Sequence, residues 1–272
     1  MSSNKTVDKY NLLDRIEEGL EAIGKTPANV TIEDLAPVDE FHVGGLDVVK
    51  PLVRHLQVGT GGAVVDLGSG SGGPARFIAR ETGAHVQGID LSPEVVETGN
   101  ELSKWMGFSD QVGLDVGDAC ATPYETAKFD AAISIHVHMF LEEPQKLYDE
   151  AFRLLRSGGR FVVFDPVVRT KEGFAYPVPW AADAATDNIC DEGTLKAMAV
   201  AAGFNFAQCI DCNDIALQWF EEVFQRAIDA GGLPPLGPHL VAGPDFPLLA
   251  MNAYANLQGG QISMLQFVFT KP

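Results

Sequence analysis

The chain has 272 residues, of which 46% are hydrophobic and 21% are charged. This composition is typical of a globular protein and excludes a disordered one. The formal net charge of -18 repels phosphate backbones and anionic lipid surfaces, so we expect neither nucleic acid nor a membrane as a partner.

The beginning of the chain predicts a helical cap. Apolar residues recur at helical spacing over residues 8–24, where Gly24 follows as a stop. Residues 26–45 are rich in turn formers with a short acidic element, and helical spacing resumes over residues 45–56. We expect residues 1–58 to form an N-terminal helical cap or lid. The stretch MSSNKTVDKYNLL lacks the apolar core of a signal peptide.

Strands and helices then alternate. Strands are predicted at 63–68, 84–91, 112–118, 129–139 and 160–167, with helices at 72–83, 92–107 and 143–159. The first strand, AVVDLG, has no polar alternation, which is typical of a strand that helices cover on both faces. The order predicts an α/β, doubly wound, Rossmann-like parallel sheet with right-handed crossovers.

The pattern loosens after Asp165. Residues 166–189 read as a long loop rich in Pro, Gly and aromatics, and later segments predict helices at 191–203, 215–232 and 248–260, a loop at 233–247, and strands at 205–211 and 261–270. We expect a core of residues 59–272 with an inserted lid at about 214–258, because long irregular connections in compact domains are usually functional.

Cysteine use favours a reducing, cytoplasmic location. The chain has four cysteines, too few for a disulfide framework in a chain of this length. Cys209 and Cys212 form C-x-x-C in a strand-like stretch, where residues three apart face opposite sides. We therefore expect packing rather than metal binding from this pair.

A glycine motif follows the first predicted strand. VVDLGSGSGGPARFIA, residues 64–79, contains Gly68, Gly70 and Gly73 in the spacing G-x-G-x-x-G. These glycines permit a tight turn and close approach of the backbone to a ligand, at a helix N-terminus that favours negative groups. The motif alone fits a dinucleotide as well as another nucleoside cofactor.

Three aspartates near the motif discriminate between these cofactors. Asp66, two residues before Gly68, favours a ligand with a positive ammonium group and opposes a pyrophosphate. Asp90, at the end of the second strand, suits a ribose diol. Asp118, after the third strand, suits the exocyclic amine of adenine, beside the backbone N–H of Ala119. Together they match S-adenosylmethionine.

Several segments resemble a known family. VVDLGSGSGG, GIDLS, VGDA, FDAAIS and LLRSGGRFVVFD together resemble the class I S-adenosylmethionine-dependent methyltransferases over about residues 60–168. The resemblance implies a seven-stranded sheet whose last strand, ISMLQFVFT, is antiparallel. DEFHVGG, YPVPWA, HLVAGPDFP and NLQGGQI resemble the small-molecule branch that includes sarcosine/dimethylglycine N-methyltransferases and quinone-type methylases.

The resemblance also implies a set of cofactor-binding residues. They are Gly68, Ser69 and Gly70 at the methionine end, Asp90 at the ribose, Leu91, Asp118 and Ala119 at the adenine, and His136 at the methionine part through its backbone. The product of the cofactor is S-adenosylhomocysteine.

Methyl transfer from a sulfonium is an in-line displacement, so the protein mainly aligns donor, methyl and acceptor; positioning supplies ~7–11 kcal/mol of the barrier. A base is needed only where the acceptor starts protonated. Candidate bases are His42, His136 and His138. The last two lie two residues apart at a strand end and are expected to face the same way, without a third ligand for a metal. A structural hydrogen bond explains His42 as well.

Aromatic residues provide a candidate acceptor wall. The candidates for acceptor contact are Phe41, Phe140, Tyr176 and Trp180, with His42 and His239 as polar partners. Such rings stack a flat substrate or hold a cation. Core packing explains these aromatics equally well.

Three functions remain open. We expect methyl transfer to a small-molecule acceptor, chiefly an amine nitrogen, and the alternative is O- or C-methylation of a phenol or quinone-like ring. A nucleoside-cofactor binding protein without chemistry belongs to another class, and a dehydrogenase is the last alternative. The oligomeric state is open.

Overall fold

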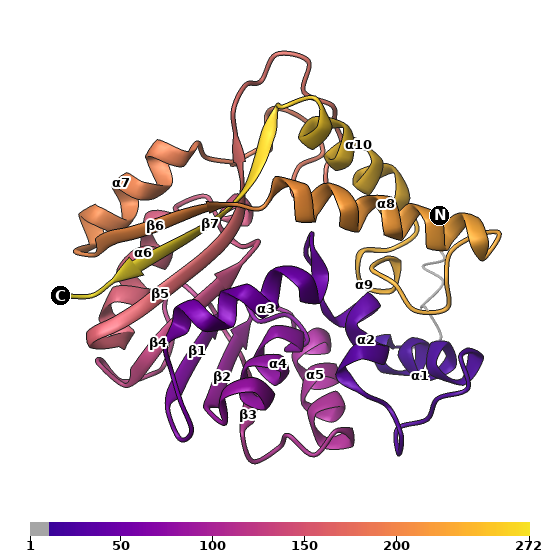
Figure 1. Cartoon of the computed structure of the whole chain (residues 1–272), viewed down its shortest axis with the longest axis horizontal. Coiled ribbons are helices and arrows are strands. Elements are labelled where there is room, and N and C mark those ends of the chain that lie inside the picture. Colours follow the sequence, from indigo (N-terminus) through magenta and orange to yellow (C-terminus); the bar gives the residue numbers. More distant parts are fainter. Residues whose placement is uncertain (1–10) are drawn as a thin grey trace, which may run out of the picture.

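A mixed sheet forms the centre of the molecule in the computed structural model, which describes residues 11–272. Its strands are β1 (Ala63–Leu67), β2 (His85–Asp90), β3 (Val112–Val116), β4 (Phe129–Ile135), β5 (Leu155–Val168), β6 (Asn205–Asp211) and β7 (Ile262–Thr270). They follow the order β3-β2-β1-β4-β5-β7-β6 (Figure 1). Strands β1 to β5 pair in parallel, and β7 is antiparallel to both β5 and β6. The predicted Rossmann-like fold with an antiparallel last strand is confirmed.

Helices cover both faces of this sheet. They are α1 (Leu12–Ala22), α2 (Ile32–Asp39), α3 (Gly45–Leu56), α4 (Gly73–Thr82), α5 (Pro93–Trp105), α6 (Gln145–Leu154), α7 (Glu192–Ala202), α8 (Asn213–Asp229), α9 (His239–Ala242) and α10 (Phe246–Gln258). Successive strand residues belong to two separate cores, as their alternating directions require. Val64 packs in the core that contains α3 and α4, and its neighbour Val65 packs in the core that contains α6 and α7.

Three segments differ from the sequence-based expectation. Within 26–45, α2 forms because Thr31 and Asp34 make a reciprocal capping box, a signal present in the letters TIED. The helix expected at 143–159 ends at Leu154, because Leu155 is already extended (ψ 147°) and starts β5. The loop expected at 233–247 contains the short helix α9. Residues 8–10 of the first predicted helix lie outside the described residues.

Helices from opposite ends of the chain meet on one side of the molecule. In Figure 1, α1 and α2 lie beside α9, below α8 and α10. The apolar face of α1, with Leu12, Ile16 and Leu20, packs in one cluster with Leu236. The predicted N-terminal cap and the predicted inserted lid are therefore in direct contact.

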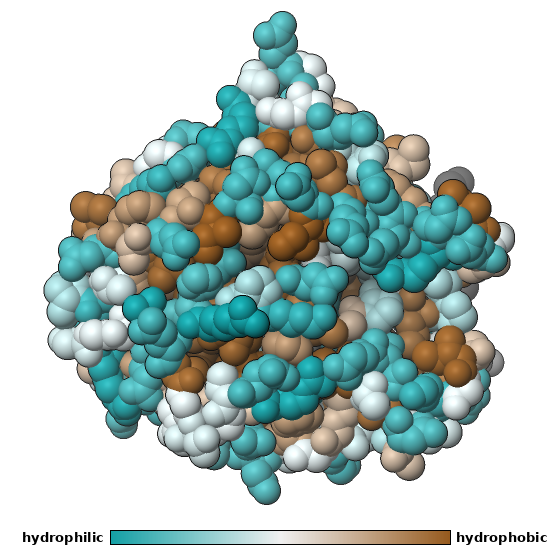
Figure 2. Space-filling model, viewed as in Figure 1, coloured by the Kyte–Doolittle hydropathy of each residue, from teal (hydrophilic) through white to brown (hydrophobic). Residues whose placement is uncertain are grey.

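The outer surface agrees with the charge of the chain. Hydrophilic residues dominate the face in Figure 2, and hydrophobic residues are exposed on it only in separate patches. Within residues 11–272, every helix is too short or too polar to cross a membrane.

A buried ion pair joins the cap to the core. Arg76 of α4 is fully buried, and its guanidinium pairs with Asp39 at the end of α2. It also donates to Gly99 O at 3.0 Å and to Ser103 Oγ at 2.9 Å, both on α5. Asp39 accepts a second hydrogen bond from Ser71 Oγ at 2.6 Å, in the glycine loop. One ion pair thus connects α2, α4, α5 and the loop after β1.

Substitution of Asp39 by alanine tests the importance of this pair. Asp39→Ala leaves the guanidinium of Arg76 buried without its counter-ion, which is expected to lower the free energy of unfolding by roughly 3–5 kcal/mol. Asp47→Ala is the matched control, because Asp47 pairs with Lys50 on the surface and such pairs contribute about 0–1 kcal/mol. Urea unfolding measures both. Equal losses in the two variants would contradict this reading.

Candidate functional site

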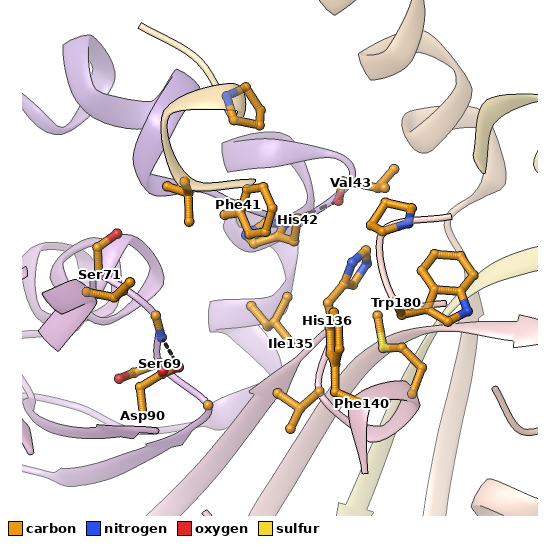
Figure 3. A pocket seen from close by; sticks show the side chains of 18 of the residues that line it. Phe41, His42, Val43, Ser69, Ser71, Asp90, Ile135, His136, Phe140 and Trp180 are labelled. Carbon is orange, nitrogen blue, oxygen red and sulfur yellow. Dashed lines mark hydrogen bonds between the residues drawn. The ribbon is translucent and has the colours of Figure 1, made fainter. Parts of the chain in front are cut away.

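A cavity of about 350 Å³ lies at the carboxyl ends of β1, β2 and β4. Figure 3 shows its walls: Ser69 and Asp90 on one side, Phe41 and His42 on a second, and His136, Phe140 and Trp180 on a third. The glycine loop and the cap both contribute to it. The sequence motifs from distant parts of the chain therefore meet in one place.

The glycine loop adopts the turn that its composition predicts. Gly68 and Gly70 have φ angles of 82° and 52°, in the left-handed region that favours glycine. A Cβ at Gly68 would lie only 2.5 Å from Val137 Cγ2. At Gly73, the third glycine of the motif, a Cβ would lie 2.7 Å from Asp39 O, so this glycine allows the cap to approach α4.

Asp90 and Asp118 line the cavity at the ends of their strands. Asp90 Oδ2 accepts from Gly70 N at 2.9 Å and Asp90 Oδ1 accepts from Ser92 N at 3.0 Å, which fixes the carboxylate against the glycine loop. Asp118 Oδ1 accepts from Cys120 N at 2.8 Å. Each carboxylate oxygen has further acceptor capacity, so both residues retain lone pairs for a ligand. Leu91 and Ala119 line the cavity beside them.

Asp66 is a buried acid with an unsatisfied oxygen. Within the described residues, its Oδ2 has no hydrogen-bond partner, and neither has Ser69 Oγ three residues later. Burial, together with the nearby carboxylates of Glu40 and Asp90, raises the pKa of the Asp66 carboxyl to about 8. A cationic group at this position would favour the ionised form of Asp66 and satisfy its free oxygen.

The unsatisfied atoms fit the cofactor that the sequence predicts. The amino group of S-adenosylmethionine is a cation that would satisfy the free oxygen of Asp66, Ser69 would offer a further polar contact, and Asp90 has lone pairs left for a sugar hydroxyl. A pyrophosphate at the same place would meet three carboxylates without a cationic side chain among the described lining residues. The residues present therefore fit a positively charged nucleoside cofactor.

His42 lines the cavity but has both ring nitrogens occupied. Its Nδ1 lies 3.2 Å from Val43 O, and its Nε2 lies 2.8 Å from Glu40 Oε2. A carbonyl only accepts, so Nδ1 carries a proton in this arrangement. Glu40 is almost fully buried, and burial raises the pKa of its carboxyl. Both ring nitrogens of His42 are thus used within the protein.

His136 and His138 do not face the same way, which corrects the expectation for this strand end. His136 lines the cavity in the left-handed conformation (φ 54°), which ends the strand pattern before His138. His138 is fully buried away from the cavity, with its Nδ1 3.0 Å from Asp165 Oδ2, off the line of a hydrogen bond. Its Nε2 accepts from Cys190 N at 3.3 Å. These contacts indicate a structural role for His138.

The side chain of His136 has a free nitrogen. Within the described residues, its Nε2 is buried without a partner. Burial lowers the pKa of this imidazole well below its usual value, and the nearby His42 and His138 lower it further, so the ring is neutral at pH 7. The main-chain N–H of His136 donates to Phe164 O at 2.8 Å, so it is already engaged within the sheet.

The structure brings only some of the residues expected in the acceptor wall to the cavity. Phe41, Phe140 and Trp180 line the cavity, whereas Tyr176 and His239 do not, which corrects the placement of the last two. Tyr176 donates to Asp187 Oδ2 at 2.6 Å instead. Pro238, the neighbour of His239, lines the cavity in place of the histidine.

Asp187 fixes the position of Trp180. Its side chain is fully buried, and its Oδ1 accepts from Trp180 Nε1 at 3.0 Å. The loop around Trp180 is also tied to α10, since Asn256 donates to Ala175 O at 2.9 Å and accepts from Ala175 N at 2.7 Å. This loop and α10 therefore form one continuous wall.

Sequence reasoning missed the residues that α8 and α10 contribute. The cavity is also lined by Trp219 and Phe220 of α8 and by Phe246, Ala250 and Ala253 of α10. The spacing of the last three residues places them on one face of a helix. A signal for them existed in this periodicity within the predicted lid segment, but apolar residues at such spacing also fit an ordinary core.

Comparison with known proteins assigns the domain. Residues 65–163 match the family model described as a methyltransferase domain. This chain carries a methyltransferase domain. The matched residues contain the glycine loop, Asp66, Asp90 and Asp118, and end within β5.

Relatives of this methyltransferase domain vary in their reactions. The chain is 33% identical over 136 residues to methyltransferase GfsG of Streptomyces halstedii, an alignment that covers 50% of this chain and 49% of that protein. The chain spans less than half the length of the curated relatives it matches.

Solved methyltransferases share the fold beyond the matched domain. A putative sarcosine dimethylglycine methyltransferase from Galdieria sulphuraria has a TM-score of 0.66 at 18% identity and covers 83% of this chain and 85% of that chain. Geranyl diphosphate C-methyltransferase from Streptomyces coelicolor A3(2), in complex with S-adenosyl-L-homocysteine, has a TM-score of 0.66 at 21% identity, over 83% and 78%. These neighbours show a class I methyltransferase fold.

The raised pKa of the Asp66 carboxyl predicts how the stability of the folded chain changes with pH. A carboxyl whose pKa rises from its ordinary value to about 8 on folding binds protons more tightly in the folded chain, so wild-type stability falls as the pH rises from about 4 to about 8. Asp66→Asn removes this ionisation and is expected to be more stable than wild type at pH 8.5 by at least about 1 kcal/mol.

Urea unfolding over pH 4 to 9 checks this expectation. The difference between Asp66→Asn and wild type should become small toward pH 4, because the carboxyl is then protonated in the folded chain and only partly ionised in the unfolded chain. Asp110→Asn, at an exposed turn, should follow the wild-type profile. Parallel profiles for Asp66→Asn and wild type would show that Asp66 ionises normally.

Proposed function

We propose that this protein transfers a methyl group from S-adenosylmethionine to a small-molecule acceptor. The observation that carries the proposal is one cavity with two chemically distinct ends. Asp66, Ser69 and Asp90 supply polar groups at one end, and Phe140 and Trp180 supply aromatic surface at the other. A positively charged methyl donor fits the first end, and an organic acceptor fits the second.

The proposed cofactor contacts are those that the sequence and the family resemblance imply, and the residues concerned line one cavity. Asp66 attracts the amino group, Gly68, Ser69 and Gly70 contact the methionine part, and Asp90 accepts from the ribose hydroxyls. Leu91, Asp118 and Ala119 surround the adenine. When bound, the cofactor supplies an activated methyl group on a sulfonium, and the chain's own residues align the acceptor with it and exclude water.

The proposed acceptor atom is an amine nitrogen. Aromatic rings of Phe41, Phe140 and Trp180 in the cavity wall favour an organic cation through their electron-rich faces. An ammonium must lose a proton before its nitrogen has a lone pair for the methyl group. Resemblance to sarcosine/dimethylglycine N-methyltransferases supports the same atom, as does the fold neighbour from Galdieria sulphuraria.

His136 is the proposed base. Its neutral imidazole lines the cavity and its Nε2 has no partner in residues 11–272, whereas both ring nitrogens of His42 are engaged. Nε2 of His136 takes the proton from the ammonium. With the cofactor bound, the nitrogen lone pair would then form the N–C bond as the S–C bond breaks, and the S–C electron pair would stay on sulfur.

A second candidate is O- or C-methylation of a phenol or quinone-like ring. The aromatic wall favours it as well, because Phe140 and Trp180 offer surface for stacking a flat ring. Product analysis by mass spectrometry and NMR distinguishes N-, O- and C-methylation.

The four cysteines, all unpaired, support the proposed cytoplasmic location.

Cofactor binding tests the first step of the proposal. Titration calorimetry should show binding of S-adenosylhomocysteine and no response to NAD. Asp90→Ala is expected to weaken that binding by at least about tenfold, or 1.4 kcal/mol, because the ribose loses its acceptors and Gly70 N loses its partner. Asp110→Ala should bind as wild type does. Tight NAD binding without binding of S-adenosylhomocysteine would reject the proposal in favour of a dehydrogenase.

Transfer of labelled methyl across a metabolite panel separates an enzyme from a non-catalytic binding protein. With the best amine of that panel, His136→Gly is expected to lose about 10²–10⁴-fold in kcat, while the φ of 54° suits glycine. Added imidazole should restore part of the rate. His85→Gly, at an exposed site, should show neither loss nor rescue, and a wild-type rate in His136→Gly would exclude His136 as the base.

A further inference from the structure

We infer that the acceptor is an apolar amine that carries no carboxylate or phosphate group. This inference rests on the proposed function and narrows it. The observation behind it is the charge of the cavity wall. Among the residues that the structure describes, no lysine or arginine lines the cavity, whereas Asp39, Asp66, Asp90 and Asp118 do.

Arg76, behind the wall, does not supply the missing cation. It is fully buried and pairs with Asp39, which stands between it and the cavity. Its remaining terminal nitrogen donates to Gly99 O and Ser103 Oγ. The positive charge of this guanidinium is therefore balanced and directed away from a ligand.

The histidines of the cavity do not replace a cation either. Burial keeps the imidazole of His136 neutral at pH 7 by lowering its pKa. His42 pairs with the buried Glu40, so the two residues together carry no net positive charge. A carboxylate or phosphate on the acceptor would lose its hydration without gaining a counter-ion, which weakens its binding.

Backbone N–H groups of the glycine loop are further donors in the cavity wall, but Gly68 N and Ser69 N both donate to Ile89 O. They lie at the cofactor end, where Gly70 N already donates to Asp90 at 2.9 Å. In the proposed function the carboxylate of S-adenosylmethionine occupies this end. A second anion there would face both that carboxylate and Asp66.

The acceptor end has the opposite character. It is formed by Met139 and Phe140 after β4, by Trp180, and by Phe220 and Phe246 of the inserted helices. This surface favours the burial of a ring or a hydrocarbon chain. The structure therefore points away from sarcosine and dimethylglycine, which carry a carboxylate, although the flanking motifs resemble enzymes of that type.

Matched pairs of ligands test the inference. Tryptamine and tryptophan differ by one carboxylate, as do phenethylamine and phenylalanine. Calorimetry on the full chain, saturated with S-adenosylhomocysteine, should show each amine binding at least about tenfold tighter than its amino acid. Sarcosine should not bind to this complex. Equal or tighter binding of the amino acids, or binding of sarcosine with no binding of either amine, overturns the inference, and so does no binding by any of the five.

A substitution at the cavity mouth should reduce the preference for the amine over its amino acid. Phe140 is 55% exposed, so a charged side chain is tolerated there. Phe140→Arg should reduce the preference for tryptamine over tryptophan by about fivefold or more, because the guanidinium supplies a counter-ion. Phe140→Gln removes the ring without adding charge and should keep the wild-type preference. An unchanged preference in Phe140→Arg, or an equal change in both variants, counts against the inference.

The two hypotheses fail in different ways. Loss of the proposed function appears as no binding of S-adenosylhomocysteine or no methyl transfer, and the ligand pairs are then compared on the chain without cofactor. Normal cofactor binding and methyl transfer, with amino acids accepted as readily as their amines, rejects the acceptor class alone.

Discussion

The structure depends on the ion pair between Arg76 and Asp39, because it holds the cap on the core at the edge where the cavity forms. A buried pair of this kind contributes little net stability compared with apolar packing, but each member is costly without the other. Asp39 lines the cavity and also accepts from Ser71. The same contact therefore anchors α2, orients the glycine loop and positions Phe41 and His42, which follow Asp39 in the chain.

Charge divides the cavity into two parts with separate tasks. Acids without cationic partners gather at the cofactor end, at a cost to the stability of the folded chain that the high pKa of Asp66 reflects. A positively charged ligand relieves that cost, so binding and stabilisation are linked. The aromatic end has no such charge and depends on shape and burial. Under the proposed function, recognition of a charged cofactor and recognition of the acceptor are thus assigned to different residues.

Local signals predicted most of the fold and the cofactor end. The glycine motif and the three aspartates lie at strand ends, and parallel strands bring their carboxyl ends to one edge, so chain order was sufficient. The sequences of the long loops gave weaker predictions about the cavity. No sequence pattern near Tyr176 predicts that its hydroxyl donates to Asp187 and that the ring does not line the cavity. Likewise, none predicts that Pro238 lines the cavity while its neighbour His239 does not. The left-handed turn at His136 likewise separates it from His138, although strand periodicity alone places them together.

The hydrogen bonds between Asn256 and Ala175 tie a loop to a helix some eighty positions later in the chain. Such a tie makes the acceptor wall a single evolutionary module. Exchange of the loop alone between relatives would leave the buried side-chain amide of Asn256 without its partners. Exchange of the helix alone would leave the backbone N–H and C=O of Ala175 without theirs. New acceptor preferences in proteins of this build should therefore arise by point changes within the wall, or by replacement of both segments at once.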